Sequence, residues 1–321
     1  MLGIWRLQLL REVARRGTLK AAAQAMSITP SAVSQQLRIL EQEAGAKLLE
    51  PHGRLVRLTD AGRMLVRHAD TITAAIAAAE ADLAATRSEV VGTLSVAAIP
   101  TAARAIMPRV LTALGLSHPK LKLMLRGLES SESLLALQMD EVDLAIVDEY
   151  DEATQVHAQG IETIEILRDP LYVALSPASD LPVAGVALAD LRDQSWIMDN
   201  ETSTIFQVTQ RACRRAGFDP QVRSHCKDYS VILALVGAGL GVGVVPGLAL
   251  YDRVIRARVA TLQPPLERIV VAAIRSERRS HPAVVALLAE LAAFASAYGN
   301  PDSDGSASGL PPAIEDRRIL A

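Results

Sequence analysis

The chain has 321 residues, of which 50% are hydrophobic and 21% charged, so it is long enough for two or three domains and too apolar to be disordered throughout. Its two cysteines exclude a disulfide-stabilised scaffold and suit a reducing compartment. The formal net charge of −3 by itself argues against a nucleic-acid-binding protein.

The overall charge hides an asymmetry. Residues 1–60 contain nine Lys/Arg and five Asp/Glu, a net charge of +4, so the remaining residues carry −7. A basic first segment is a reason to look for DNA contacts there, and scattered surface charge is the alternative. Arg6 and Arg11 interrupt the first apolar stretch, while glycines and Pro246 break the uncharged run 231–250. We therefore expect no signal peptide, no membrane span and a cytoplasmic protein.

Three helices are expected near the N-terminus, over residues 4–16, 19–26 and 30–43. Thr18 and Thr29 stand where the N-caps of the second and third helices belong, because their hydroxyls can accept hydrogen bonds from the first turn. The third helix begins with Pro30, which suits a first helical position. Its apolar stripe consists of Val33, Leu37 and Leu40.

The opposite face of the third helix carries hydroxyls, an amide and one arginine, and no acid before Glu41. These residues recur at helical spacing: Ser31, Ser34, Gln35 and Arg38. Such groups can contact phosphates and base edges in a major groove, where an acid would be repelled. The pattern predicts a helix-turn-helix. Binding to a single strand is disfavoured, because Trp5 is the only aromatic residue in this segment.

A short hairpin is expected over residues 48–59, where Gly53 allows a turn between two extended pieces. It would act as a wing that carries Arg54 and Arg57 to the DNA backbone, and an ordinary surface hairpin is the alternative. The segment 1–60 is therefore predicted to be a winged helix-turn-helix domain.

The same segment resembles the LysR-type transcriptional regulators. The resemblance rests on Ala21-Ala22-Ala23, Met26, Thr29-Pro30-Ser31-Ala32-Val33-Ser34-Gln35-Gln36-Leu37, Leu40-Glu41, Gly45 and Arg57-Leu58-Thr59-Asp60-Ala61-Gly62, and it extends at lower specificity to about residue 297. Two departures stand out. Leu49-Glu50-Pro51 replaces the usual Phe-Glu-Arg, which removes one phosphate contact, and Lys20 stands where the family often has serine.

The resemblance implies double-stranded operator DNA, a small-molecule effector and the transcription machinery as partners of a homodimer or homotetramer. The predicted DNA-binding residues are Thr18, Lys20, Thr29, Pro30, Ser31, Ser34, Gln35, Arg38, Arg54 and Arg57.

A long helix is expected from Asp60 to about Glu89, because this stretch has no proline and only Gly62 near its start. Its apolar residues follow a heptad pattern, which predicts pairing with a second copy of the chain. The alternative is packing against another part of the same chain. The predicted dimerisation residues are Leu65, Ala69, Ile72, Ile76, Ala79 and Leu83, within a linker of residues 61–90.

The remainder alternates strand-like and helical segments, which predicts a largely parallel α/β sheet. We expect a two-lobed effector domain over residues 91–297, similar to the periplasmic-binding-protein fold of LysR-type regulators. Lobe 1 comprises about 91–168 and 268–297, and lobe 2 about 169–267. The chain crossovers between the lobes should act as hinges. Residues 298–321 are rich in Pro, Gly, Ser and Asp and are predicted to be disordered.

Catalytic and cofactor motifs do not emerge from this segment. The glycine run at 237–243 lacks the spacing of a dinucleotide loop and the Lys-Ser/Thr of a P-loop, so we interpret it as a tight turn from helix to strand. The six histidines show no metal-ligand spacing, and no nucleophile-elbow motif occurs. We expect no metal, no cofactor and no enzyme, and an enzyme or solute-binding protein with the same body fold is the weaker alternative.

Effectors in α/β lobes gather at the ends of strands and the starts of helices, where free N–H groups attract anions. The predicted effector-binding residues are Pro100, Thr101, Glu129, Ser130, Asp148, Thr202, Ser203 and Thr204. The family resemblance favours Pro100 and Thr101 together with the turn of residues 202–204. Simple helix capping is the alternative for each hydroxyl. Glu129 and Asp148 either restrict the site to a neutral or cationic effector or face solvent.

A thiol-based redox sensor is the rival mechanism, because some members of the family sense oxidants through a cysteine pair. Cys213 is expected on a helix among Arg211, Arg214 and Arg215, whose charges would lower its pKa. The interpretation that we favour is that Cys213 and Cys226 are two ordinary thiols.

Overall fold

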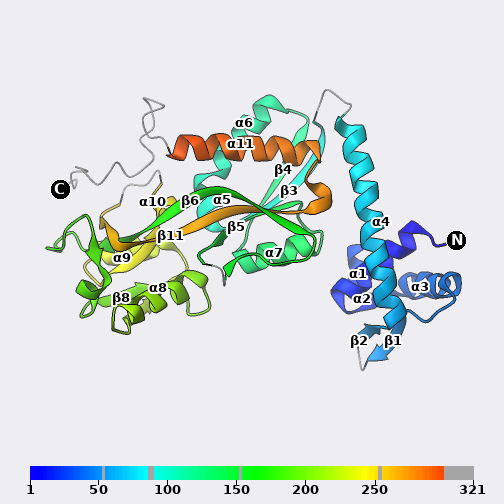
Figure 1. The fold of residues 1–321 in the computed structure, drawn as a ribbon, viewed down its shortest axis with the longest axis horizontal. Helices are drawn as coiled ribbons and strands as arrows, with labels where there is room; N and C mark the ends of the chain where they lie inside the picture. Colours follow the sequence, from blue (N-terminus) through cyan, green and yellow to red (C-terminus); the bar gives the residue numbers. More distant parts are fainter. Residues whose placement is uncertain (53–54, 86–89, 152–153, 252–254, 300–321) are drawn as a thin grey trace. The chain divides into compact units, whose positions relative to one another are not determined.

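The computed structural model describes residues 1–52, 55–85, 90–151, 154–251 and 255–299 (Figure 1). The chain divides into two compact units, Met1–Ser88 with Glu277–Pro282, and Glu89–Ser276 with the residues from Ala283 onward. We call residues 1–85 the head and the second unit the body. Of the tail predicted to be disordered, residues 300–321 lie outside the described residues, and residues 298–299 instead end the last helix, where Tyr298 is buried.

The head consists of three helices, a hairpin and a long helix. They are α1 (Ile4–Arg16), α2 (Leu19–Ala25), α3 (Pro30–Ala44), β1 (Leu49–His52), β2 (Leu55–Leu58) and α4 (Asp60–Ala85). Its core gathers the buried aliphatic residues of α1, α2 and α3 around Val33, Leu37 and Leu40. The predicted helices and the predicted hairpin are therefore confirmed.

The start of α4 packs closely on the hairpin. A Cβ added at Gly62 would overlap the backbone oxygen of Leu48 and lie 3.1 Å from the side chain of Leu58. Glycine at this position is thus a packing requirement, since any side chain would push α4 away from the wing.

The body contains a seven-stranded sheet in the order β10-β6-β11-β5-β3-β4, with β7 paired to β11. Its strands are β3 (Gly92–Ala98), β4 (Leu121–Gly127), β5 (Leu144–Glu149), β6 (Ile161–Leu175), β7 (Val186–Ala187), β10 (Gly243–Pro246) and β11 (Arg258–Arg275). A separate two-stranded sheet pairs β8 (Ser195–Met198) with β9 (Gln221–His225).

The helices cover both faces of these sheets. They are α5 (Pro100–Ala105), α6 (Met107–Ser117), α7 (Ser130–Gln138), α8 (Thr204–Arg215), α9 (Tyr229–Gly237), α10 (Gly247–Leu250) and α11 (Pro282–Gly299), with short 3₁₀ turns η2 (Leu188–Leu191) and η3 (Ser276–Arg278). In lobe 1, α5, α6 and α11 pack on one face and α7 on the other. Alternate residues of β3, β5 and β11 therefore enter two different cores, as in Val96 and Ala97.

The α/β fold class is confirmed, and the largely parallel sheet is a correction. Strands β3, β4 and β5 are parallel, but β11 runs antiparallel to both β5 and β6. The reason is that the chain passes from lobe 1 to lobe 2 along β6 and returns along β11, so the two paired strands run in opposite directions. These strands are 15 and 18 residues long and run side by side through both lobes (Figure 1). The apolar pattern of the sequence predicts strands only over Leu171–Ser176 and Arg268–Ile274, which overlap parts of β6 and β11. It also predicts a single helix over about residues 102–115, whereas the structure has two helices, because Pro108 cannot continue α5.

Candidate DNA-reading surface and effector site

The N-terminus of α3 is fixed by its caps. The hydroxyl of Thr29 accepts a hydrogen bond from the N–H of Ala32 at 3.2 Å and lies 2.9 Å from the hydroxyl of Ser31. Thr18 caps α2 in the same way, through the N–H of Ala21. Thr29 therefore fixes the turn between α2 and α3, and Thr18 fixes the turn between α1 and α2, whatever else they contact.

The outward face of α3 matches the predicted recognition surface. Ser31, Gln35 and Arg38 are exposed, Ser34 is half-buried, and Lys20 is exposed on α2. The Arg38 guanidinium donates a hydrogen bond to the Ser34 hydroxyl at 3.4 Å, which is its only hydrogen bond among the described residues. This face thus presents donors and acceptors with few partners of their own.

The wing pairs β1 and β2 with Glu50 opposite Arg57. Arg57 is exposed, as predicted, whereas Arg54 lies outside the described residues. Glu41 ties the wing to α3, because its carboxylate accepts hydrogen bonds from the N–H groups of Leu48 at 2.9 Å and Leu49 at 3.4 Å. Burial by itself would raise the pKa of Glu41, but these bonds and Lys47 outweigh it and leave the pKa below its usual value.

The heptad residues of α4 fall into two groups. Leu65 and Ala69 pack into the core of the head, where Ala69 is only 1% exposed. The prediction that Ala69 contacts a second copy is therefore corrected, because its side chain is already covered by its own head. It lies beside the ion pair of Arg11 and Asp70. Ile72 and Ala79 are exposed and Ile76 is half-buried. The side chain of Leu83 lies outside the described part of the chain.

A buried arginine organises the place where the two lobes join. Arg268, 2% exposed, donates from Nε to Asp169 at 2.9 Å, from Nη1 to Asp148 at 2.9 Å and from Nη2 to the Thr101 hydroxyl at 2.8 Å. Asp169 also accepts hydrogen bonds from the Leu248 N–H at 3.0 Å and the Tyr298 hydroxyl at 3.1 Å. Residues of β11, β6, β5, α5, α10 and α11 therefore meet in one network.

Asp148 extends this network towards α7. It accepts a hydrogen bond from Ser130 at 2.6 Å and another from the Tyr150 hydroxyl at 3.1 Å. Three of the predicted effector residues, Thr101, Ser130 and Asp148, are thus brought together, although they come from three different elements. We call this set, with Glu129, Asp199 and Arg268, the interlobe site.

Two of the predicted effector residues are helix caps. The Glu129 carboxylate and the N3 residue Glu132 form a capping box at the start of α7, and the Ser203 hydroxyl caps α8 through Phe206 N–H at 3.3 Å. The N–H groups expected to attract anions are therefore partly occupied by the protein's own side chains. Pro100 and Thr202 are exposed, and Thr204 is half-buried at the start of α8.

The carboxylates of the interlobe site influence one another. Burial, followed by the charges of Asp199 and Asp148, raises the pKa of Glu129. Burial also raises the pKa of Asp199, against the hydrogen bond from Asn200 N–H and the charge of Lys227. Glu129 follows β4 and Asp199 follows β8, so acids from both lobes approach each other here.

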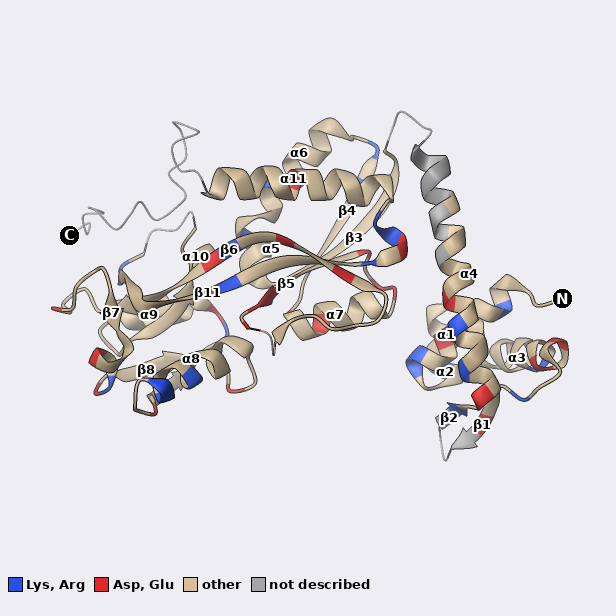
Figure 2. Ribbon diagram, viewed as in Figure 1, with Lys and Arg blue, Asp and Glu red and all other residues tan. Residues whose placement is uncertain are grey.

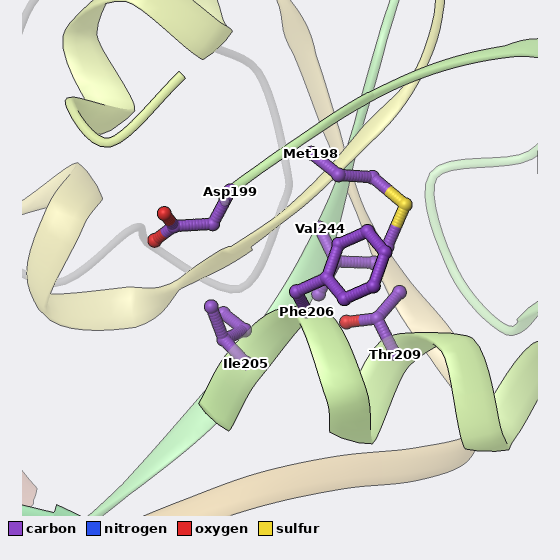
Figure 3. Close-up of a pocket in the computed structure, with 6 residues that line it drawn as sticks. All are labelled: Met198, Asp199, Ile205, Phe206, Thr209 and Val244. Carbon is purple, nitrogen blue, oxygen red and sulfur yellow. The ribbon is translucent and has the colours of Figure 1, made fainter. Parts of the chain in front are cut away.

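A small pocket lies next to this site in lobe 2. Its lining residues are Met198, Asp199, Ile205, Phe206, Thr209 and Val244. Figure 3 shows the Asp199 carboxylate pointing away from the ring of Phe206. None of the predicted effector residues lines this pocket, although it adjoins the turn that carries Thr202, Ser203 and Thr204.

Cys213 has the surroundings of an ordinary buried thiol and not those of an activated one. It is fully buried in the lobe 2 core, and burial together with the charge of Asp219 raises its pKa to about 12. The neighbouring arginines of α8 (Figure 2) do not counter this, since Arg211 pairs with Asp151 at 2.7 Å and Arg214 with Asp219 at 2.6 Å. Cys226, half-buried, packs against a different core, and both cysteines are free thiols.

The glycine run is a turn, as predicted. Gly239 and Gly241 have positive φ angles between α9 and β10, and a Cβ at Gly241 would overlap the backbone oxygen of Ser195. Within the described ranges, no group of three or more His, Cys, Asp or Glu side chains is placed to hold a metal ion. No described helix is long and apolar enough to cross a membrane.

A winged helix-turn-helix joined to a two-lobed α/β body defines a DNA-binding regulator with a ligand-binding domain. Residues 4–63 match the profile of the bacterial regulatory helix-turn-helix protein, lysR family, and residues 87–296 match the LysR substrate binding domain. The chain belongs to the LysR family. The expected LysR-type transcriptional regulator is confirmed.

Several characterised regulators are similar over most of their length. A hydrogen peroxide-inducible genes activator of Dickeya chrysanthemi is 26% identical over 260 residues, covering 80% of this chain and 83% of that protein. The transcriptional dual regulator GltC of Bacillus subtilis is 28% identical over 243 residues, covering 75% and 79%.

Solved structures share the fold. A full-length OxyR variant from Pseudomonas aeruginosa has a TM-score of 0.69 at 20% identity, covering 91% of this chain and 95% of that one. Full-length CbnR in complex with its target DNA has a TM-score of 0.51 at 23% identity, covering 92% and 99%.

Asp169, Asp199 and Arg268 are site residues that sequence reasoning missed. Asp169 and Arg268 sit within or beside apolar strand segments, where an unpaired charge would be costly. That conflict is the signal which could have revealed them. The predicted strands begin at Leu171, two residues after Asp169, and at Arg268, so neither charge is treated as part of a site in the sequence analysis.

Proposed function

We propose that the chain reads double-stranded operator DNA through α3 and holds the DNA backbone through the wing. The observation that carries this proposal is the exposed face of Ser31, Gln35 and Arg38 on a helix whose N-terminus is fixed by Thr29. Ser34 and Gln35 read base edges, while Lys20, Arg38, Arg54 and Arg57 hold phosphates. This assignment also places the protein in the cytoplasm, with its DNA, and gives it no catalytic step.

The test separates base contacts from phosphate contacts. Arg57→Ala should weaken binding to all sequences alike and reduce the slope of log affinity against log salt by about one. Gln35→Ala should relax the preference at one position of each half-site, at a cost of about 1–3 kcal/mol. Binding is measured across salt concentrations and across operator variants selected from the source genome. Uniform losses in both variants would contradict the division of roles.

We further propose that α4, within a linker of residues 61–90, pairs with α4 of a second copy through Ile72, Ile76, Ala79 and Leu83. Support comes from the exposure of Ile72 and Ala79, which continue the heptad beyond the part of α4 covered by the head. Ile72→Asp should convert the oligomer to a smaller species in sedimentation, because a charge cannot be buried unpaired in the seam. Thr71→Asp, one residue away and off the seam, is the control.

A small-molecule effector is proposed to bind at the interlobe site, since strands β6 and β11 join the lobes there and Thr101, Ser130 and Asp148 converge. The effector alters operator binding only to the extent that it prefers one lobe arrangement. Thr202→Trp should abolish the effector's change of the DNase footprint and leave DNA affinity without effector intact. A normal response in this variant would place the effector elsewhere.

Thiol-based sensing is the second candidate, because several relatives are described as hydrogen peroxide-inducible genes activators. The burial and raised pKa of Cys213 oppose it, since the thiolate is the reactive form. Under this candidate, peroxide should change the operator footprint of the native chain and not that of Cys213→Ser. An unchanged footprint in both would exclude it.

A further inference from the structure

Among the residues that the structure describes, the cation at the base of the interlobe site is Arg268, and each of its three nitrogens already bonds within the protein. Nε, Nη1 and Nη2 of Arg268 donate within the protein to Asp169, Asp148 and Thr101, respectively. Two carboxylates surround this single guanidinium, so the buried cluster carries a net charge of −1. An anion placed here would meet that charge in a poorly hydrated setting, where electrostatic repulsion is strong.

The helix starts around the site offer little to an anion either. One first-turn N–H group of each of α7, α8 and α9 donates to the capping side chain, which is Glu129, Ser203 and Asp228, respectively. Two of these three caps are themselves acids. Helix α5 has no side-chain cap, but it has only six residues and begins with Pro100, which has no N–H. The usual attraction of a helix N-terminus for anions is thus reduced at α7, α8 and α9.

The outer part of the site is acidic as well. Glu129 lies within electrostatic range of Asp199, Asp148 and Glu132, and Lys227 is the basic group that acts on both Glu129 and Asp199. His225 is the other basic neighbour of Asp199, and it also lies 3.9 Å from Glu201. Carboxylates therefore outnumber cations at the rim as they do at the base.

One buried donor nevertheless remains unused. Thr101 is 6% exposed and its hydroxyl oxygen accepts from Arg268, which has no acceptor atoms, so the direction of that bond is fixed. The hydroxyl proton of Thr101 meets no acceptor among the residues that the structure describes. An unpaired buried donor costs free energy, and a ligand acceptor atom would satisfy it.

We propose that the effector of this chain is an uncharged or cationic molecule, and that the interlobe site excludes anions. This inference rests on the proposed effector site and adds the charge class of the ligand.

The test measures the electrostatic potential at the site without knowledge of the effector. Pro100→Cys, next to Thr101 and exposed, is combined with Cys226→Ser, and Cys213 is buried. The rates of modification by a cationic, an anionic and a neutral methanethiosulfonate reagent are each divided by the rate with free cysteine. Ser117→Cys in the same background is the control, since Ser117 is also exposed and has no acid within four residues along the chain.

The ratio of the cationic to the anionic modification rate should be about tenfold higher at position 100 than at position 117. This difference between the two positions should shrink in 1 M salt. Glu129→Gln and Asp199→Asn should each lower the ratio of cationic to anionic rates at position 100. Equal rates, a faster anionic reagent, or an excess that neither substitution changes would overturn the proposal. Operator affinity is measured separately on the unlabelled chain, so a failure of the proposed DNA-binding function is recognised independently.

Discussion

The polar groups of the candidate sites differ between the head and the body in their exposure and in their bonding partners. On α3, Ser31, Gln35 and Arg38 lie exposed with few partners, whereas Thr101, Asp148 and Arg268 in the body are largely buried and bonded to one another. A surface that meets DNA can leave its groups hydrated until DNA replaces the water. A charged group inside a domain must bring its own partners, because losing water without compensation costs several kcal/mol.

The strongest way to break this comparison is to remove Arg268. Arg268→Leu leaves Asp148 and Asp169 buried without their cation, and we expect the body to lose about 3–5 kcal/mol of unfolding free energy while the head is unchanged. The two tryptophans separate the units, since Trp5 lies in the head and Trp196 is fully buried in the body. Denaturant titrations of Trp5→Phe and Trp196→Phe backgrounds follow each unit.

Arg168→Leu is the control, because Arg168 is exposed on β6 and pairs with Glu165 and Glu267 at the surface. It should leave both transitions in place. A similar loss from Arg168→Leu and Arg268→Leu would mean that burial of the network is not what stabilises the body.

The head depends on close packing instead. Gly62→Ala places a Cβ on the backbone oxygen of Leu48, and we expect a loss of about 1–3 kcal/mol in head stability, followed through Trp5. Gly115→Ala makes the same change in α6, where nothing lies within 4 Å, and should stabilise the body by at most about 1 kcal/mol. Equal effects would argue against steric contact between α4 and the wing.

A smaller effect is expected from the one carboxylate that ties the wing to α3. Glu41→Gln should cost the head about 1–2 kcal/mol near pH 7, because charge-assisted hydrogen bonds from Leu48 and Leu49 weaken. The folded-state pKa of Glu41 is lowered, so its contribution is present above the unfolded pKa and disappears as pH falls through the folded pKa. Head stability of the two proteins, measured by Trp5 fluorescence, should therefore converge as the pH falls below the unfolded-state pKa of about 4.3.

The smallest expected effect concerns the wing surface. Glu50 lies directly opposite Arg57 in the hairpin, where side chains are about 5 Å apart at the Cβ atoms. Glu50→Gln should raise affinity for every DNA sequence by about 0.5 kcal/mol at low salt, since an acid near the phosphates is removed. Unchanged affinity at low salt would place Arg57 away from the DNA backbone.

Local patterns determined most of the head. Thr18 and Thr29 as caps, Pro30 at a first helical position and the stripe of Val33, Leu37 and Leu40 act within a few residues of one another, and the structure agrees with each. The heptad of α4 was also visible. The division of this heptad into a part buried in the head and an exposed part was not visible, because the burial of Ala69 depends on how α1 packs against α4.

The interlobe site was decided by the tertiary structure. Sequence placed Thr101, Ser130 and Asp148 correctly at strand ends and helix starts, since parallel strands end at a common edge. It did not show Arg268, whose partners Asp169, Asp148 and Thr101 lie 99, 120 and 167 positions away. Caps and periodicity arise from neighbours along the chain and can be read there, whereas the partners of a buried charge are set only when distant strands pair.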